Sequence, residues 1–228
     1  MAKWRSPIYN LKTSSGKDVK VDVTTSVSLG LPPKGTVLKE LIPFFRTKNV
    51  NTVIDFGAGA LRHVFPLLEA GFQVCAVEFN EQFRDGICRE RLEKANRHAN
   101  FSKLIWPHDF IHDDRKFDAG ILSFVLQTMP EADERDLVLK LLRKKLKAEA
   151  YLFYVSRYGQ LTAAMKKRRV KDGYYMWPDR AVHSFYTEFN TEDTHKWMKK
   201  YKFDHIKSFS ERGTDQIFLY AKGKATWI

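Results

Sequence analysis

A short apolar strand that ends in a glycine-rich turn constrains the fold of this chain most strongly. Residues 53–56 are an apolar run that contains Asp55, and Gly57 and Gly59 follow before a helix-like segment. Glycines at such a junction let the backbone turn tightly and let a ligand approach the main chain. About twenty residues later, Glu78 ends a second apolar run, where its carboxylate can accept hydrogen bonds from ribose hydroxyls. The pattern predicts a nucleoside site at the carboxyl ends of parallel strands.

Strand-like and helix-like runs alternate from residue 50 onward. The expected strands are residues 53–56, 73–78, 102–106, 117–125 and 151–155, and two closing runs, 203–209 and 216–221, predict a hairpin. Alternation of this kind implies parallel pairing through right-handed crossovers. We therefore expect an α/β fold with a doubly wound, mostly parallel seven-stranded sheet and a C-terminal antiparallel hairpin strand.

Two segments depart from this alternation. Residues 1–49 are expected to form an N-terminal cap, with a short strand at 19–24, and a lead-in helix from Thr36. They precede a single domain over residues 50–228. Within that domain, residues 157–190 interrupt the rhythm after the fifth strand, and we interpret them as a lid or substrate-binding insertion.

The composition indicates a globular protein that works in the cytoplasm. Hydrophobic residues make up 43% of the 228 residues, which suffices for a core. No apolar run approaches the roughly 18 residues of a membrane span, and the first residues lack the apolar segment of a secretory signal. Cys75 and Cys88 are not in a CxxC pair, so we expect two reduced, buried thiols.

A nicotinamide cofactor fits the glycine turn poorly. The dinucleotide fingerprint places a third glycine at position 62, where this chain has Arg62. Asp55, two residues before the first glycine, suits a ligand that carries positive charge and no pyrophosphate. A nicotinamide-dependent oxidoreductase is therefore disfavoured.

The same residues resemble a known family. Residues 53–80 look like motifs I and II of the class I S-adenosylmethionine-dependent methyltransferases, and residues 117–126 look like motif IV. The resemblance covers roughly residues 50–222 and implies S-adenosylmethionine as cofactor. The chain departs from the family in two places. Leu61 stands where a third glycine is common, and Ala148-Glu149-Ala150 replaces the usual Pro-Gly-Gly turn.

What the resemblance implies for the cofactor can be placed on matching positions. Asp55, Gly57 and Gly59 would line its methionine and ribose parts, Glu78 would hold the ribose hydroxyls, Phe79 would lie against the adenine, Asp109 would contact the adenine amine, and Ser123 and Phe124 would lie near the transferred methyl group.

The methyl acceptor leaves a fainter trace in the sequence. Ser123-Phe124-Val125-Leu126 replaces the Asn/Asp-Pro-Pro-aromatic motif of enzymes that methylate base amines, and neither cysteine lies in this region. The segment looks more like that of small-molecule methyltransferases, or of some that act on tRNA. We expect a small-molecule acceptor. RNA or DNA is the alternative, because a net charge of +12 favours polyanions. A non-catalytic binding protein is a further alternative, which the intact motif residues disfavour.

The insertion supplies the acceptor-side candidates. Lys166, Lys167, Arg168, Arg169 and Lys171 precede a group of aromatic residues. This pattern suits phosphate contact with base stacking, a lid over an anionic or aromatic small molecule, or simply a solvated helix face followed by core aromatics. The candidate substrate-binding residues are Arg157, Tyr158, Tyr174, Tyr175, Trp177 and Arg180. The candidate catalytic groups are His183 and Tyr186.

A metal centre is not expected. His108 and His112 have the i, i+4 spacing of a helical metal site, and Asp113 and Asp114 are adjacent. However, the segment falls where the resembled family has a loop, and no cysteine joins the cluster.

Overall fold

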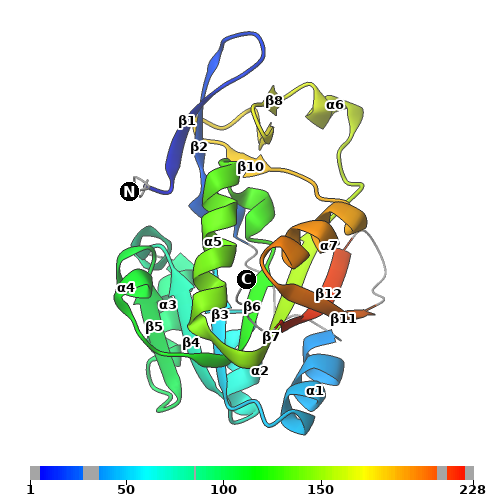
Figure 1. The fold of residues 1–228 in the computed structure, drawn as a ribbon. Coiled ribbons are helices and arrows are strands. Elements are labelled where there is room, and N and C mark those ends of the chain that lie inside the picture. The colour runs from blue at the N-terminus through cyan, green and yellow to red at the C-terminus, as the bar shows by residue number, and fades with distance from the viewer. Residues whose placement is uncertain (1–5, 28–35, 85, 210–214, 224–228) are drawn as a thin grey trace.

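Seven strands form the central sheet of the computed structural model, which describes residues 6–27, 36–84, 86–209 and 215–223 (Figure 1). These strands are β3 (Thr52–Phe56), β4 (Gln73–Glu78), β5 (Phe101–Ile105), β6 (Phe117–Ser123), β7 (Leu146–Arg157), β11 (Phe203–Phe209) and β12 (Asp215–Lys222). Their order is β11-β12-β7-β6-β3-β4-β5. Strands β5, β4, β3, β6 and β7 pair in parallel, and β12 is antiparallel to both of its neighbours. The predicted doubly wound sheet with a C-terminal hairpin is confirmed.

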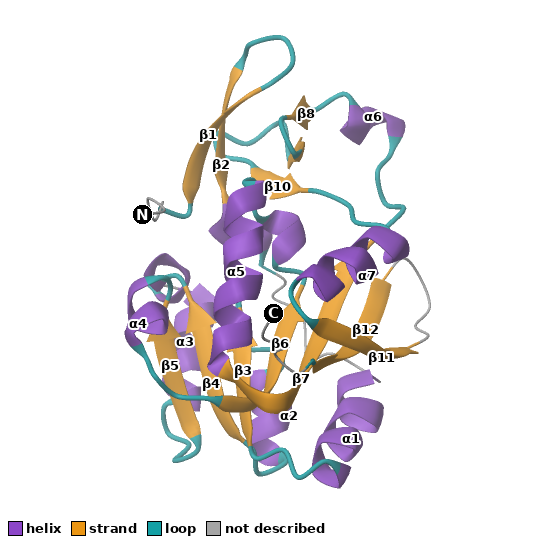
Figure 2. Ribbon diagram, viewed as in Figure 1, coloured by secondary structure: helices purple, strands orange, loops and turns teal. Residues whose placement is uncertain are grey.

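Helices cover both faces of the sheet (Figure 2). On one face lie η2 (Thr36–Leu41), α1 (Ile42–Thr47), α2 (Val64–Glu69) and α3 (Gly86–Ala95), and on the other lie α4 (His108–His112), α5 (Ala132–Lys145) and α7 (Thr191–Lys200). Because neighbouring strand residues point to opposite faces, Val53 joins the first core and Ile54 the second. Both side chains are fully buried, so β3 is held from two sides where it enters the glycine turn.

The first helix after β3 begins later than the apolar pattern suggests. The helix-like segment that follows the glycine turn in the sequence becomes helical only at Val64, where α2 starts, because Leu61 has φ +58°. Pro66 consequently falls in the first turn, where its missing N–H removes no helical hydrogen bond. The delayed start leaves residues 57–63 as an irregular loop above the sheet.

A cap made of two distant segments lies beyond one end of the sheet (Figure 1). Its first segment holds the hairpin β1 (Ile8–Lys12) and β2 (Asp18–Asp22), followed by η1 (Val23–Ser26). The insertion supplies α6 (Ala163–Lys166), β8 (Arg169–Val170), β9 (Gly173–Met176) and β10 (Ser184–Tyr186). The bridges Thr13–Val170 and Val21–His183 join the segments. They share a small core of Tyr9, Val19, Val21, Val170 and Phe185.

Cys75 and Cys88 are both buried thiols. Among the helices that the structure describes, we find none with the length and apolarity needed to cross a bilayer.

Candidate active site

A pocket opens at the carboxyl ends of β3, β4 and β6. Its floor and one side come from the loop after β3, from the end of β4 with η3 (Asn80–Phe83), and from the segment after β6 with η4 (Leu126–Thr128). The N-terminal segment adds a further wall. The lining includes Tyr9, Thr24, Ser26, Val27, Gly57, Gly59, Arg62, His63, Glu78, Phe79, Trp106, Ser123, Phe124, Gln127, Met129 and Arg157. This is the edge of an open α/β sheet at which ligands ordinarily bind.

The loop that floors the pocket depends on its glycines. Gly57 and Gly59 have φ of +70° and +52°, and the Gly57 N–H donates to the Val77 carbonyl at 2.9 Å. A Cβ at position 57 would overlap the Val125 side chain. Leu61, where the resembled family often has glycine, adopts the same left-handed conformation. The backbone here is bare because a side chain at position 57 has no room.

Glu78 ties the second strand to this loop. Its Oε2 accepts the Gly59 N–H at 2.9 Å, and its Oε1 accepts the Phe79 N–H at 2.9 Å. Burial raises the pKa of Glu78 to about 6, and the two N–H donors oppose that rise. The carboxylate is therefore mainly ionised at neutral pH. Each of its oxygens keeps a second acceptor site, so the group can still receive hydroxyl donors from a ligand.

Asp55 is a buried acid whose second oxygen lacks a donor. Its side chain is 1% exposed, and within the described chain no hydrogen bond reaches Oδ2. His63 Nδ1 lies 3.8 Å away. Burial, with a smaller contribution from Glu78, raises the Asp55 pKa to about 8, and burial lowers the His63 pKa to about 4. Both groups are thus mainly neutral near pH 7. A cation bound nearby would favour ionised Asp55.

The pocket lining includes six of the predicted cofactor residues, and two, Asp55 and Asp109, are not part of it. Gly57, Gly59, Glu78, Phe79, Ser123 and Phe124 all line the pocket. Asp55 is buried and not among the described lining residues, but its Oδ2 lies 3.8 Å from Nδ1 of His63, which does line the pocket. Phe124 has φ +58°, a conformation that for a bulky residue clusters at functional sites. Asp109 lies outside the pocket. Its Oδ2 accepts the Ile105 N–H at 3.1 Å, and its side chain is 45% exposed, so the contact of Asp109 with adenine stays a prediction.

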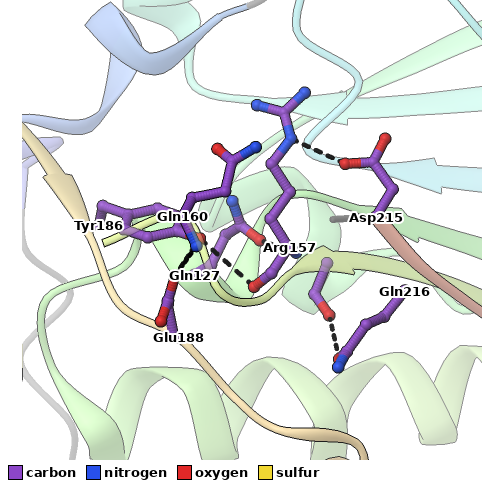
Figure 3. A network of polar contacts seen from close by, with 8 residues as sticks. Gln127, Arg157, Gln160, Tyr186, Glu188, Asp215 and Gln216 are labelled. Atoms are coloured by element: carbon purple, nitrogen blue, oxygen red, sulfur yellow. Dashed lines mark hydrogen bonds and ion pairs between the residues drawn. The ribbon is translucent and has the colours of Figure 1, made fainter. Parts of the chain in front are cut away.

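Arg157 is the acceptor-side candidate that reaches the pocket. Its N–H donates to Gln127 Oε1 at 2.8 Å, and its Nε donates to Asp215 Oδ1 at 2.9 Å (Figure 3). Its guanidinium carbon lies 4.6 Å from the centre of the Phe124 ring. Gln127, which no sequence pattern singled out, is 4% exposed and therefore a buried anchor for this residue.

Tyr186 supports Arg157 and does not line the pocket. Its hydroxyl donates to the Arg157 carbonyl at 3.3 Å and to Glu188 Oε1 at 3.2 Å (Figure 3). Burial and the Glu188 charge raise the pKa of the phenol, so the hydroxyl stays protonated near neutral pH. The structure thus places Tyr186 beside the Arg157 main chain, and a catalytic role for it stays a prediction.

The other candidates from the insertion stay in the cap. His183 exchanges main-chain hydrogen bonds with β2, and its Nδ1 lies 2.9 Å from the Trp177 carbonyl oxygen. Trp177 is 55% exposed and stacks under Arg180. None of Tyr158, Tyr174, Tyr175, Trp177, Arg180 and His183 is among the described lining residues. Tyr174 and Tyr175 lie on β9, which pairs with β8 and β10, and Tyr175 packs against the small core of the cap.

Several residues that line the pocket were not predicted from the sequence as site residues. Arg62 and His63 are two of them, and their position directly after the glycine turn could have indicated that they lie there. Tyr9, Thr24 and Ser26 come from a polar segment whose approach to the pocket depends on contacts with the insertion. The paired histidines His108 and His112 lie on α4 with ring centres 5.1 Å apart. No cluster of metal-ligating side chains is found in the part of the chain described.

Solved structures share this architecture. A methyltransferase of Burkholderia thailandensis, crystallised with 1,6-didemethyltoxoflavin and S-adenosylhomocysteine, superposes with a TM-score of 0.60 at 14% identity, covering 84% of this chain and 80% of that one. A Methanosarcina mazei protein described as a SAM-dependent methyltransferase gives 0.61 at 16%, covering 79% and 97%. Synechocystis magnesium protoporphyrin IX methyltransferase with bound SAH gives 0.58 at 16%, covering 82% and 83%.

The chain therefore has the class I methyltransferase fold. At the level of sequence, neither a protein-family model nor a curated protein matches it.

Proposed function

We propose that this chain transfers a methyl group from S-adenosylmethionine to a small molecule. One observation carries the proposal: the Glu78 carboxylate lies within a hydrogen bond of the Gly59 N–H, in a pocket at the carboxyl ends of parallel strands. That arrangement offers a ribose an acid from one strand and bare backbone from the next. The Burkholderia and Synechocystis proteins named above, crystallised with S-adenosylhomocysteine, act on small molecules according to their names, which supports the same class here.

The residues present suit this cofactor part by part. Glu78 would hold the ribose hydroxyls, and Phe79 would lie against the adenine. Asp55, with an oxygen that lacks a described donor, suits the positive charge of the methionine end. Ser123 and Phe124 would lie toward the methyl group, because Ser123 ends β6 at the pocket and the Phe124 ring lies next to the Arg157 guanidinium. When bound, S-adenosylmethionine supplies an electrophilic methyl group on a sulfonium.

The protein's contribution to such a reaction is alignment and exclusion of water. The Gly57–Gly59 backbone and Glu78 would set the cofactor's depth, and the Phe124 ring with Arg157 would set the acceptor's position above it. A general base is needed only if the accepting atom arrives protonated. His63 lines the pocket as a neutral imidazole, with its pKa lowered to about 4 by burial, so it would accept a proton weakly.

Calorimetry tests the cofactor assignment. S-adenosylhomocysteine should bind the purified chain with a dissociation constant on the order of micromolar, and NADH should not bind. Incubation with methyl-labelled S-adenosylmethionine and a metabolite extract should then transfer label to a small-molecule fraction. Binding of NADH in place of S-adenosylhomocysteine would refute the assignment. Tight binding without any transfer would favour the non-catalytic alternative.

A second candidate acceptor is nucleic acid, and the charge of the insertion favours it. Lys166, Lys167, Arg169 and Lys171 are exposed, and none forms an ion pair with a described residue. Salt-sensitive retention of tRNA or duplex DNA by the pure protein, followed by label transfer to it, would promote this candidate. Labelling of the small-molecule fraction alone would demote it.

A further inference from the structure

Arg157 is held by two contacts to its main chain and two to its side chain. Gln127 fixes its main-chain N–H and Tyr186 its carbonyl. Asp215 fixes the Nε edge of the guanidinium at 2.9 Å, and the Phe124 ring supports its face. A side chain restrained in this way loses little conformational entropy when it binds a ligand. Arg157 is therefore organised before any ligand arrives.

The open side of Arg157 carries its terminal nitrogens. Neither Nη1 nor Nη2 donates a hydrogen bond to a described residue, and the side chain is 43% exposed. In Figure 3 these two nitrogens point away from Asp215, Tyr186 and Glu188. Their planar pair of donors matches the two oxygens of a carboxylate or the oxygens of a phosphate. Because Asp215 already occupies Nε, the Nη side is the one left for a ligand.

The charge around this group also favours an anion. Arg62 lines the same pocket, and its pKa is lowered by burial and then by the charges of Arg157 and Arg91, with Asp215 acting in the opposite direction. Two guanidinium groups thus line one pocket, and the positive potential that they add favours an anionic acceptor over a neutral one.

We propose that the methyl acceptor carries an oxyanion, a carboxylate or a phosphate, and that the Nη1 and Nη2 groups of Arg157 bind it beside Phe124. The proposal rests on the proposed function and narrows its substrate class. It makes Arg157 a specificity-determining residue and gives Gln127, Tyr186 and Asp215 the task of positioning it. Arg180 is a matched cation, since it also lies over an aromatic ring, that of Trp177, but outside the described pocket lining.

The test measures charge preference on the chain saturated with S-adenosylhomocysteine. Benzoate and phenyl phosphate are compared with benzamide, a neutral probe of benzoate's shape, by calorimetry or ligand-observed NMR. At least one anionic probe should bind about tenfold more tightly than benzamide, and the one preferred tells carboxylate from phosphate. Arg157→Gln should abolish the preference, Arg157→Lys should keep part of it, and Arg180→Gln should leave it unchanged.

Two results would overturn the proposal. One is a wild-type chain that shows no anion preference, whether the probes bind equally or not at all. The other is an Arg157→Gln variant that keeps the preference, or that loses about tenfold in affinity for S-adenosylhomocysteine itself, since Arg157 would then hold the cofactor's carboxylate. Failure of the wild-type chain to bind S-adenosylhomocysteine would instead refute the proposed function. The same probes titrated into the ligand-free chain would still report on Arg157.

Discussion

The Glu78 carboxylate and the Gly59 main-chain N–H lie 2.9 Å apart, one at the end of β4 and the other in the loop after β3. Replacing Glu78 with alanine removes the acceptor that we assign to the ribose. We expect affinity for S-adenosylhomocysteine to fall by about 1–3 kcal/mol, measured by calorimetry. Glu81→Ala, a change at an exposed acid three residues away, should leave the affinity as it is. Equal affinities in wild type and Glu78→Ala would remove Glu78 from the site.

Asp55 should lower the stability of the ligand-free fold and raise its affinity for the cofactor. Its pKa of about 8 in the folded chain exceeds its ordinary value of 3.8, because burial disfavours the charge. The stability linked to this group is therefore complete at low pH and declines as the pH rises from about 4 through about 8. Asp55→Asn carries no such charge.

We expect the ligand-free Asp55→Asn variant to melt at a higher temperature than wild type at about pH 8, by an amount that shrinks toward about pH 5. The same variant should bind S-adenosylhomocysteine more weakly, because the ammonium loses a carboxylate partner. A variant that loses stability and affinity together across the whole pH range would instead make Asp55 a structural residue.

Gly57→Ala should eliminate cofactor binding. The substitution forces an alanine into φ +70° and drives its Cβ into the Val125 side chain, so the loop must move. Gly71→Ala is the control, since Gly71 has φ +92° but open space around a Cβ. Both variants should lose about 1 kcal/mol of stability to backbone strain. Only Gly57→Ala should lose affinity for S-adenosylhomocysteine in calorimetry, and retention of affinity there would argue against the loop as the binding surface.

Glu149→Gly should stabilise the chain. Glu149 has φ +60°, a conformation that costs a non-glycine residue roughly 1 kcal/mol, and its side chain is exposed. Chemical denaturation should show a gain of up to about 1 kcal/mol, whereas Glu149→Ala, which keeps a Cβ, should show none. A destabilised glycine variant would mean that the glutamate side chain contributes more than the strain removes.

Leu61 shows why the same replacement would fail there. It is also left-handed, at φ +58°, but its side chain is fully buried in the core beside α2. Burial of a leucine contributes about 1.5–3 kcal/mol, which exceeds the strain. Leu61 and Glu149 thus both adopt a backbone conformation that favours glycine, but only Leu61 has a buried side chain that offsets the strain.

Much of the sheet could be predicted because each central strand is apolar along its own length. Strand β4 spans residues 73–78 as expected, and β3 differs from the expectation by one residue. Only the second strand of the hairpin β1–β2 was predicted. The first strand has no clear apolar alternation, because Ile8 is exposed and Tyr9 is buried against residues of the insertion. No local pattern encodes a partner so far along the chain.

The pocket residues likewise divide into those that a local pattern places and those that depend on contacts between distant segments. Gly57, Gly59 and Glu78 could be placed because strand ends and a short loop determine their positions. For residues 157–190 the sequence gives the residue types but does not show which side chains enter the pocket. Arg157 and Tyr186 are 29 residues apart and share a hydrogen bond. Arg157 lines the pocket, whereas Tyr186 contacts the Arg157 main chain outside the described lining. Gln127 was missed since a single amide after a strand has no distinguishing pattern.

The cap has a consequence for any attempt to shorten this protein. Its hydrophobic centre joins Tyr9, Val19 and Val21 to Val170 and Phe185, and Tyr9 and Thr24 also form part of the pocket wall. Expression of residues 50–228 alone would leave two apolar side chains of the insertion facing water and would remove a wall from the site. The hairpin β1–β2 and η1 therefore belong to the minimal unit for crystallisation or assay.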